Sequence, residues 1–199
     1  MNENMLSLCA NRMAGWWVYG EEVNALAMKY IPVILVLLGL AACDFGGPEP
    51  EWCKGGECTY QYYENSQVRV RREYDDTLED SVIINVGGDN GDMLVFLFEY
   101  VKKDRPNVQD DELTRQFWFE VDPDVEAFTY TTDEALSAAN AYVARYCFCS
   151  WPFGWPAQGK LIGNKLDDTS WEICGDLTYD LGYGQGTETF SFERVFTKF

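Results

Sequence analysis

The chain has 199 residues, of which 33 are acidic and 15 are basic, and its formal net charge is −18. It contains no histidine, which excludes the Ser-His-Asp triad, the Cys-His dyad and histidine-ligated zinc or haem sites. The acidity argues against nucleic-acid binding, because phosphates are bound by Lys and Arg. A hydrophobic share of 47% with 16% aromatic residues indicates a folded chain rather than a disordered one.

Residues 28–42 have the order of a secretory signal peptide. Lys29 provides a short basic start, an apolar run follows, and the small residues Ala41 and Ala42 stand directly before Cys43. The apolar run is shorter than the roughly 20 residues that a membrane-spanning helix needs. We therefore expect an export signal, the alternative being a buried apolar strand or helix that contains a cysteine.

The motif Leu40-Ala41-Ala42-Cys43 resembles the lipobox of bacterial lipoproteins. The resemblance implies that a diacylglycerol is attached to the thiol of Cys43 and that the chain is cut before this residue. It also implies a location in the bacterial cell envelope, with the protein held to a membrane through the lipid. Asp44 resembles the inner-membrane retention signal of enteric bacteria, but other phyla sort differently, so the inner and outer membranes both stay open.

Residues 1–27 precede this signal, although a lipoprotein signal begins at the initiator methionine. We interpret them as the product of a start site assigned too far upstream, and a true extension is the alternative. Residues 43–51 are rich in Gly, Pro and acidic side chains and predict a flexible tether. Residues 52–199 then predict a single folded domain of sufficient length to bury a core.

Alternating apolar and polar residues predict strands along most of this domain. The clearest one-sided patterns lie in segments 117–121, 171–179 and 190–196, and the last 40 residues indicate a meander with turns at Asp167-Asp168 and at 182–186. Asn90-Gly91 stands between two apolar runs and predicts a β-hairpin, because both residues tolerate a positive φ.

One helix is expected after Thr131, where Glu134 completes the spacing of a capping box. Leu136, Ala139, Val143 and Tyr146 then recur at helical intervals and predict an apolar stripe packed on a sheet. The fold class is therefore mostly β, an antiparallel β-sandwich or open barrel with one packed α-helix.

The cysteines of an exported domain are expected to pair. Cys53 and Cys58 flank a short Gly-rich segment and are candidates for one disulfide, while Cys174 is expected to pair with either Cys147 or Cys149. A four-thiolate zinc site formed by Cys53, Cys58, Cys147 and Cys149 is the alternative, but its spacing is not that of a standard zinc knuckle.

The segment 147–156 holds two Trp-Pro pairs and two phenylalanines, and it carries the ligand-binding candidates Trp151, Phe153 and Trp155. Flat aromatic faces held by prolines are suited to bind sugar rings or apolar ligands. Aromatic side chains in loops are more often buried than used for binding. The competing interpretation is therefore a hydrophobic plug folded over the open end of the β-structure.

No catalytic residue, metal site or cofactor is singled out by spacing. Asp89-Asn90-Gly91-Asp92 has some character of a calcium loop but lacks the remaining ligands, so a turn explains it better than calcium. We expect a lipid-anchored binding or structural module, with a membrane and a carbohydrate or apolar ligand as partners. The alternatives are a carboxylate-based glycan hydrolase and a calycin-like carrier of a small ligand.

Overall fold

The computed structural model describes residues 50–103, 113–147, 154–182 and 184–199, which belong to the compact unit Pro48–Phe199. Among the described residues, no helix has both the length and the apolar character required to cross a membrane. The elements are η2 (Glu51–Cys53), β1 (Gly56–Asp75), β2 (Asp80–Asn90), β3 (Met93–Lys102), β4 (Leu113–Val121), β5 (Ala127–Tyr130), α3 (Asp133–Ala138), β6 (Tyr142–Cys147), β7 (Gly154–Pro156), β8 (Gln158–Asp167), β9 (Ser170–Asp180) and β10 (Thr187–Lys198).

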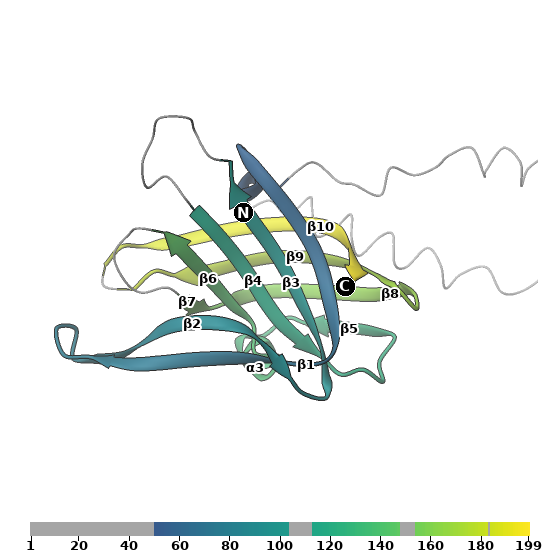
Figure 1. Cartoon of the computed structure of the whole chain (residues 1–199), viewed down its shortest axis with the longest axis horizontal. Helices are drawn as coiled ribbons and strands as arrows, with labels where there is room; N and C mark the ends of the chain where they lie inside the picture. Colours follow the sequence, from purple (N-terminus) through teal and green to yellow (C-terminus); the bar gives the residue numbers. More distant parts are fainter. Residues whose placement is uncertain (1–49, 104–112, 148–153, 183) are drawn as a thin grey trace, which may run out of the picture. The chain divides into compact units, whose positions relative to one another are not determined.

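The described strands form one sheet that closes on itself. Its order is β2-β7-β6-β4-β3-β1-β10-β9-β8-β5, and β2 also pairs with β1. Six strands, β1, β3, β4, β6, β7 and β2, therefore form a closed antiparallel barrel within the described part of the chain. Strands β10, β9, β8 and β5 extend the sheet and lie across β3, β4 and β6 (Figure 1). This mostly β architecture with a short helix confirms the predicted fold class.

Two apolar clusters lie on opposite faces of β3 and β4. Phe96 and Phe98 point into the larger cluster, which is shared with β8, β9 and β10. Val95 and Leu97, which alternate with them, point into a smaller cluster built only from strands of the closed barrel. The side chains of the smaller cluster therefore fill the inside of the barrel.

The larger cluster confirms the faces predicted from period-two patterns. Its members include the residues expected to be buried on three separate strands, namely Phe117, Phe119, Val121, Trp171, Ile173, Leu177, Tyr179, Phe190, Phe192 and Phe196. The expected meander is also present, since β8 pairs with β9 and β9 with β10, both antiparallel. What the patterns missed is that Trp118, on the other face of β4, is buried as well.

The predicted hairpin at Asn90-Gly91 is wrong. Both β2 and β3 pair with β1 instead of with each other, and Ser66 is the register partner of Asn90 and of Met93. The chain thus turns a corner at Gly91 while it follows a bend in β1 (Figure 1). In this part of the chain a hairpin turn lies instead between β1 and β2, where Asp75 opposes Asp80.

The predicted helix exists but is shorter than expected and begins one residue later. Thr132 is the N-cap, and its side chain accepts a hydrogen bond from the Ala135 amide at 3.2 Å. Asn140 adopts a positive φ of 46° just beyond the helix. Val143 and Tyr146 therefore belong to β6, so the apolar stripe predicted for one helix is divided between a helix and a strand.

Gly91 is expected to be essential to the corner. A Cβ at this position would lie 2.8 Å from the Ser66 carbonyl oxygen and 2.6 Å from the Gln67 Cβ. Gly91→Ala should therefore lower the free energy of unfolding by about 1–3 kcal/mol in urea denaturation. Gly87→Ala is the matched control, because a Cβ on that β2 glycine meets nothing within 4 Å. Equal stabilities of the two variants would contradict the role of the corner.

Candidate functional site

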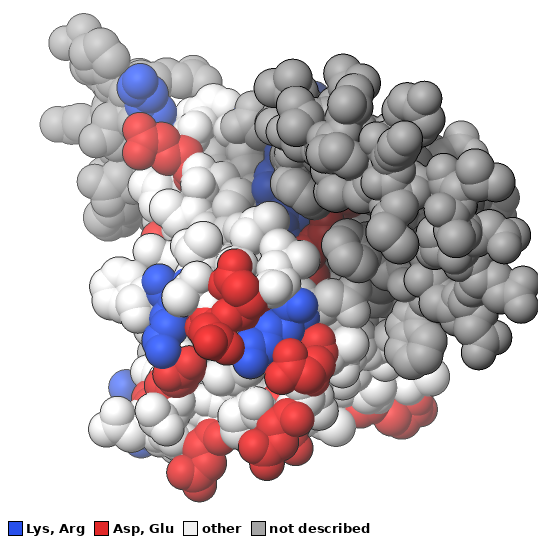
Figure 2. All heavy atoms as spheres, turned by 90° about the vertical axis from the view of Figure 1, so that its right-hand side faces the viewer, with Lys and Arg blue, Asp and Glu red and all other residues white. Residues whose placement is uncertain are grey.

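A pocket of about 380 Å³ opens at the end of the sandwich where β1 bends and where β8 turns into β9. Residues of β1, β3, β8, β9 and β10 line it, so it unites segments that are far apart in the sequence. Tyr62 and Trp171, each 1% exposed, and Leu94 form its apolar part. Figure 2 shows that acidic and basic side chains lie next to one another on this side of the domain.

Lys198, near the end of β10, reaches across to β1. Its Nζ lies 2.7 Å from the Glu64 carboxylate, and both side chains are 40% exposed. This hydrogen bond raises the pKa of Lys198 above the ordinary lysine value. The buried Tyr62 lies beside the pair and donates a hydrogen bond of 3.1 Å to the carbonyl oxygen of Asp168. Burial, together with the charge of Glu64, raises the pKa of Tyr62, which keeps the phenol neutral.

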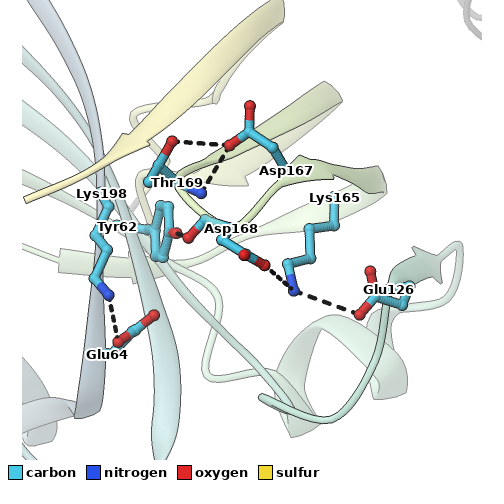
Figure 3. Close-up of polar contacts among 8 residues, drawn as sticks. All are labelled: Tyr62, Glu64, Glu126, Lys165, Asp167, Asp168, Thr169 and Lys198. Atoms are coloured by element: carbon cyan, nitrogen blue, oxygen red, sulfur yellow. Dashed lines mark hydrogen bonds and ion pairs between the residues drawn. The ribbon is translucent and has the colours of Figure 1, made fainter.

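Lys165 occupies the other side of the pocket, between β5 and the turn that joins β8 to β9 (Figure 3). Its Nζ lies 3.4 Å from the Glu126 carboxylate and 3.5 Å from that of Asp168. Desolvation lowers the pKa of Lys165, but the two carboxylates outweigh it and raise the pKa overall. Asp167 caps the same turn, and its hydrogen bond from the Thr169 amide lowers the pKa of the carboxyl group.

These protonation states suit binding rather than proton transfer. A general base at neutral pH needs a pKa close to 7, whereas the two lysines are shifted further from that value. The lining contains two lysines and three carboxylates, Glu64, Asp92 and Asp168, so the pocket is nearly neutral. Such a pocket offers hydrogen-bond donors and acceptors to a small polar molecule.

The structure describes only part of the predicted aromatic ligand platform, and that part, Trp155, does not line the pocket. Trp155 belongs to β7 and is only 4% exposed. Its indole Nε1 donates a hydrogen bond of 3.1 Å to the Leu181 carbonyl oxygen, and its ring packs 5.5 Å from that of Tyr179. Trp155 is thus a core residue, as the plug interpretation expects, whereas Trp151 and Phe153 lie outside the described residues.

The predicted disulfide between Cys53 and Cys58 is present, with the two Cα atoms 5.6 Å apart. Because these thiols are bonded to each other, the four-thiolate zinc alternative is wrong. Cys147 and Cys174 are also disulfide-bonded, and Cys149 lies outside the described residues. The pairing of these three cysteines stays a prediction.

The segment considered for calcium is engaged in ordinary protein contacts. Asp89 forms an ion pair of 2.9 Å with Arg69 on the neighbouring strand, and it accepts a hydrogen bond from the Asn90 amide. That amide and the arginine lower the pKa of Asp89. In the described ranges, no group of three or more His, Cys, Asp or Glu side chains is arranged to hold a metal ion.

The pocket residues were not singled out by the sequence, because they come together only through tertiary structure. Lys165 and Lys198 have no motif around them, and their acidic partners lie up to 134 residues away. The one local signal is the predicted turn at Asp167-Asp168, which supplies the Asp168 side chain and carbonyl group.

The buried position of Trp155 leads to a stability prediction. Trp155→Ala should lower the free energy of unfolding by about 3–5 kcal/mol, because it leaves a cavity and an unpaired Leu181 carbonyl group. Tyr74→Ala is the matched control, since Tyr74 is an aromatic strand residue that is 64% exposed. Chemical denaturation of both variants is the measurement, and a Trp155→Ala protein as stable as the control would contradict a packing role.

Comparisons with family models, with curated proteins and with solved structures return no match to this chain. The chemistry of the described residues is therefore the basis for a functional assignment.

Proposed function

We propose that the chain is an exported bacterial envelope protein, anchored through a lipid on Cys43, whose β-domain acts as a binding or structural module. The observation that carries this proposal is the disulfide between Cys53 and Cys58, ten residues or more beyond the lipobox-like motif. Disulfides form in oxidising compartments, so the bond agrees with an export signal at residues 28–42. The tether, residues 43–51, would hold the acidic domain beside the membrane.

The binding role is supported by the pocket that Tyr62, Trp171, Lys165 and Lys198 line. Its lysines remain charged at neutral pH, and their carboxylate partners expose acceptor oxygens. The two aromatic side chains are almost fully buried, so hydrogen bonds rather than ring stacking would dominate recognition. A small carbohydrate, rich in hydroxyl groups, matches this surface best.

The two alternative functions have less support. A glycan hydrolase needs a carboxyl group with a raised pKa. In the described residues, the two carboxyl groups whose pKa departs from the ordinary value are those of Asp89 and Asp167, and both are lowered. A calycin-like carrier needs an open barrel interior, and here Leu97, Trp118 and their neighbours occupy it.

Lipid attachment is tested by expressing the full gene in a bacterial host with Cys43→Ala and, as a matched control, Cys9→Ala. The wild-type protein and the control should reach the membrane fraction. Their intact mass should correspond to a chain that begins at Cys43 and carries acyl chains. Cys43→Ala should lose the acyl mass and the membrane association. A wild-type mass that retains Met1 without lipid would overturn the anchor.

Carbohydrate binding is tested by titrating the full chain with N-acetylglucosamine and following the indole N–H signal of Trp171 by NMR. We expect a saturable shift that weakens about tenfold in Lys198→Met, which removes a charged donor. Lys160→Met is the control, because Lys160 is exposed on β8 and does not line the pocket. Absence of a shift with this sugar would contradict the proposed ligand.

A further inference from the structure

Two arginines lie directly opposite each other on neighbouring strands at the other end of the sandwich. Arg115 of β4 and Arg145 of β6 are register partners, so their side chains project on the same face. Phe117, two residues after Arg115, and its register partner Val143, two residues before Arg145, belong to the larger apolar cluster. The guanidinium groups therefore stand at the edge of the core, with side chains only 24% and 20% exposed.

Among the described residues, one carboxylate forms ion pairs with both arginines, and it belongs to Glu188. One oxygen of Glu188 lies 3.9 Å from Arg115, and the other lies 3.9 Å from Arg145. Glu188 also accepts a hydrogen bond from the hydroxyl group of Tyr179, which is itself 1% exposed. Burial, the hydrogen bond to Glu188 and the charge of that residue raise the pKa of Tyr179, so the phenol adds no negative charge.

The donors of the two guanidinium groups are poorly satisfied. Within the described residues, neither group donates a hydrogen bond, and the Nε of Arg115 is buried with no acceptor. Each group lies over an indole ring, at 5.4 Å from that of Trp52 for Arg115 and at 5.1 Å from that of Trp155 for Arg145. These rings attract the cations but accept no strong hydrogen bond.

This arrangement is costly as it stands. Like charges directly opposite each other on adjacent strands destabilise a sheet, and partly buried donors without acceptors add to the cost. Exposed Arg69, by contrast, has its own carboxylate at 2.9 Å. A bound oxyanion would remove both penalties, because guanidinium groups present paired N–H donors that match two acceptor oxygens.

We propose that Arg115 and Arg145 bind the oxyanion of a ligand, a phosphate or carboxylate group, between the indole rings of Trp52 and Trp155. Glu188 holds the two side chains in place, and within the described part of the chain its one negative charge is shared by two positive charges. The site is distinct from the nearly neutral pocket at the other end of the strands and does not require its ligand.

Two sources of the anion are chemically equivalent, a soluble phosphate and a phospholipid headgroup. The second source rests on the proposed function, since it needs the lipid on Cys43. Residues 44–50, which join Cys43 to η2, span at most about 25 Å when extended. Trp52 of η2 borders the arginine pair, so an anchored domain would hold this site within reach of the membrane surface.

The test uses the full chain with ¹⁵N-labelled arginine in a phosphate-free maltoside detergent. Inorganic phosphate is added while the arginine Nε–Hε signals are recorded. We expect saturable shifts of the Arg115 and Arg145 signals and a rise in melting temperature with phosphate. Phosphatidylglycerol vesicles form a second arm: shifts with vesicles alone identify a headgroup, and shifts with free phosphate identify a soluble ligand. No saturable shift in either arm would overturn the proposal.

Variants separate binding from folding. Arg145→Gln should weaken phosphate binding at least about tenfold and abolish the phosphate-dependent rise in melting temperature, while its melting temperature in anion-free buffer stays at or above that of the wild type. Arg115→Lys keeps the charge but loses the paired donors, so it should fold and bind more weakly. Arg69→Gln is the matched control. If the arginine pair were purely structural, Arg145→Gln would be less stable than the wild type in every buffer. The melting temperature of the wild type would then not change with phosphate.

Discussion

The bend in β1 depends on one buried carboxylate. Glu120 of β4 is 7% exposed, and its Oε1 accepts a hydrogen bond of 2.5 Å from the Val68 amide. That amide lies just beyond Ser66, the last β1 residue paired with β3, so it has lost its strand partner on that side. The other oxygen of Glu120 accepts a hydrogen bond of 2.7 Å from Asn140 beyond the helix. Without this acceptor, a buried amide would stand unpaired at the point where the barrel closes.

The two charged sites differ in how their basic side chains are paired with carboxylates. At the bent end, β1 brings Glu64 to Lys198, and each lysine there has a carboxylate within 3.5 Å. At the opposite end, the antiparallel register of β4 and β6 places Arg115 against Arg145, with Glu188 shared between them. Counting the ion pairs of the described residues, each lysine at the bent end has its own carboxylate, whereas the two arginines share one, in a chain of net charge −18.

From the sequence, the buried face of a strand is easier to predict than the strands with which it pairs. Alternation along Phe117 and Phe119 is a local property of one strand, and it correctly indicates the core side. Asn90-Gly91 has the residue types of a hairpin turn. These two residues carry no information about β1, which is long enough to pair with both β2 and β3. Arg115 does carry a usable signal, since it stands two residues before Phe117 on the face that faces inward. The pair of Glu64 and Lys198 carries none, because these two residues are 134 positions apart and meet only in the folded chain.

The disulfide between Cys53 and Cys58 has a mechanical consequence for the domain. It closes a small loop directly after Trp52, whose ring stacks on Phe190 with the centroids 4.0 Å apart and also packs against Phe98. A pulling force applied to the chain before Pro50 therefore acts first on the disulfide-closed loop and on the buried aromatic stack around Trp52. Because Trp52 lies against Phe98 of β3 and Phe190 of β10, a pull on the N-terminal side of β1 must first remove this side chain from the core before β1 separates from β3.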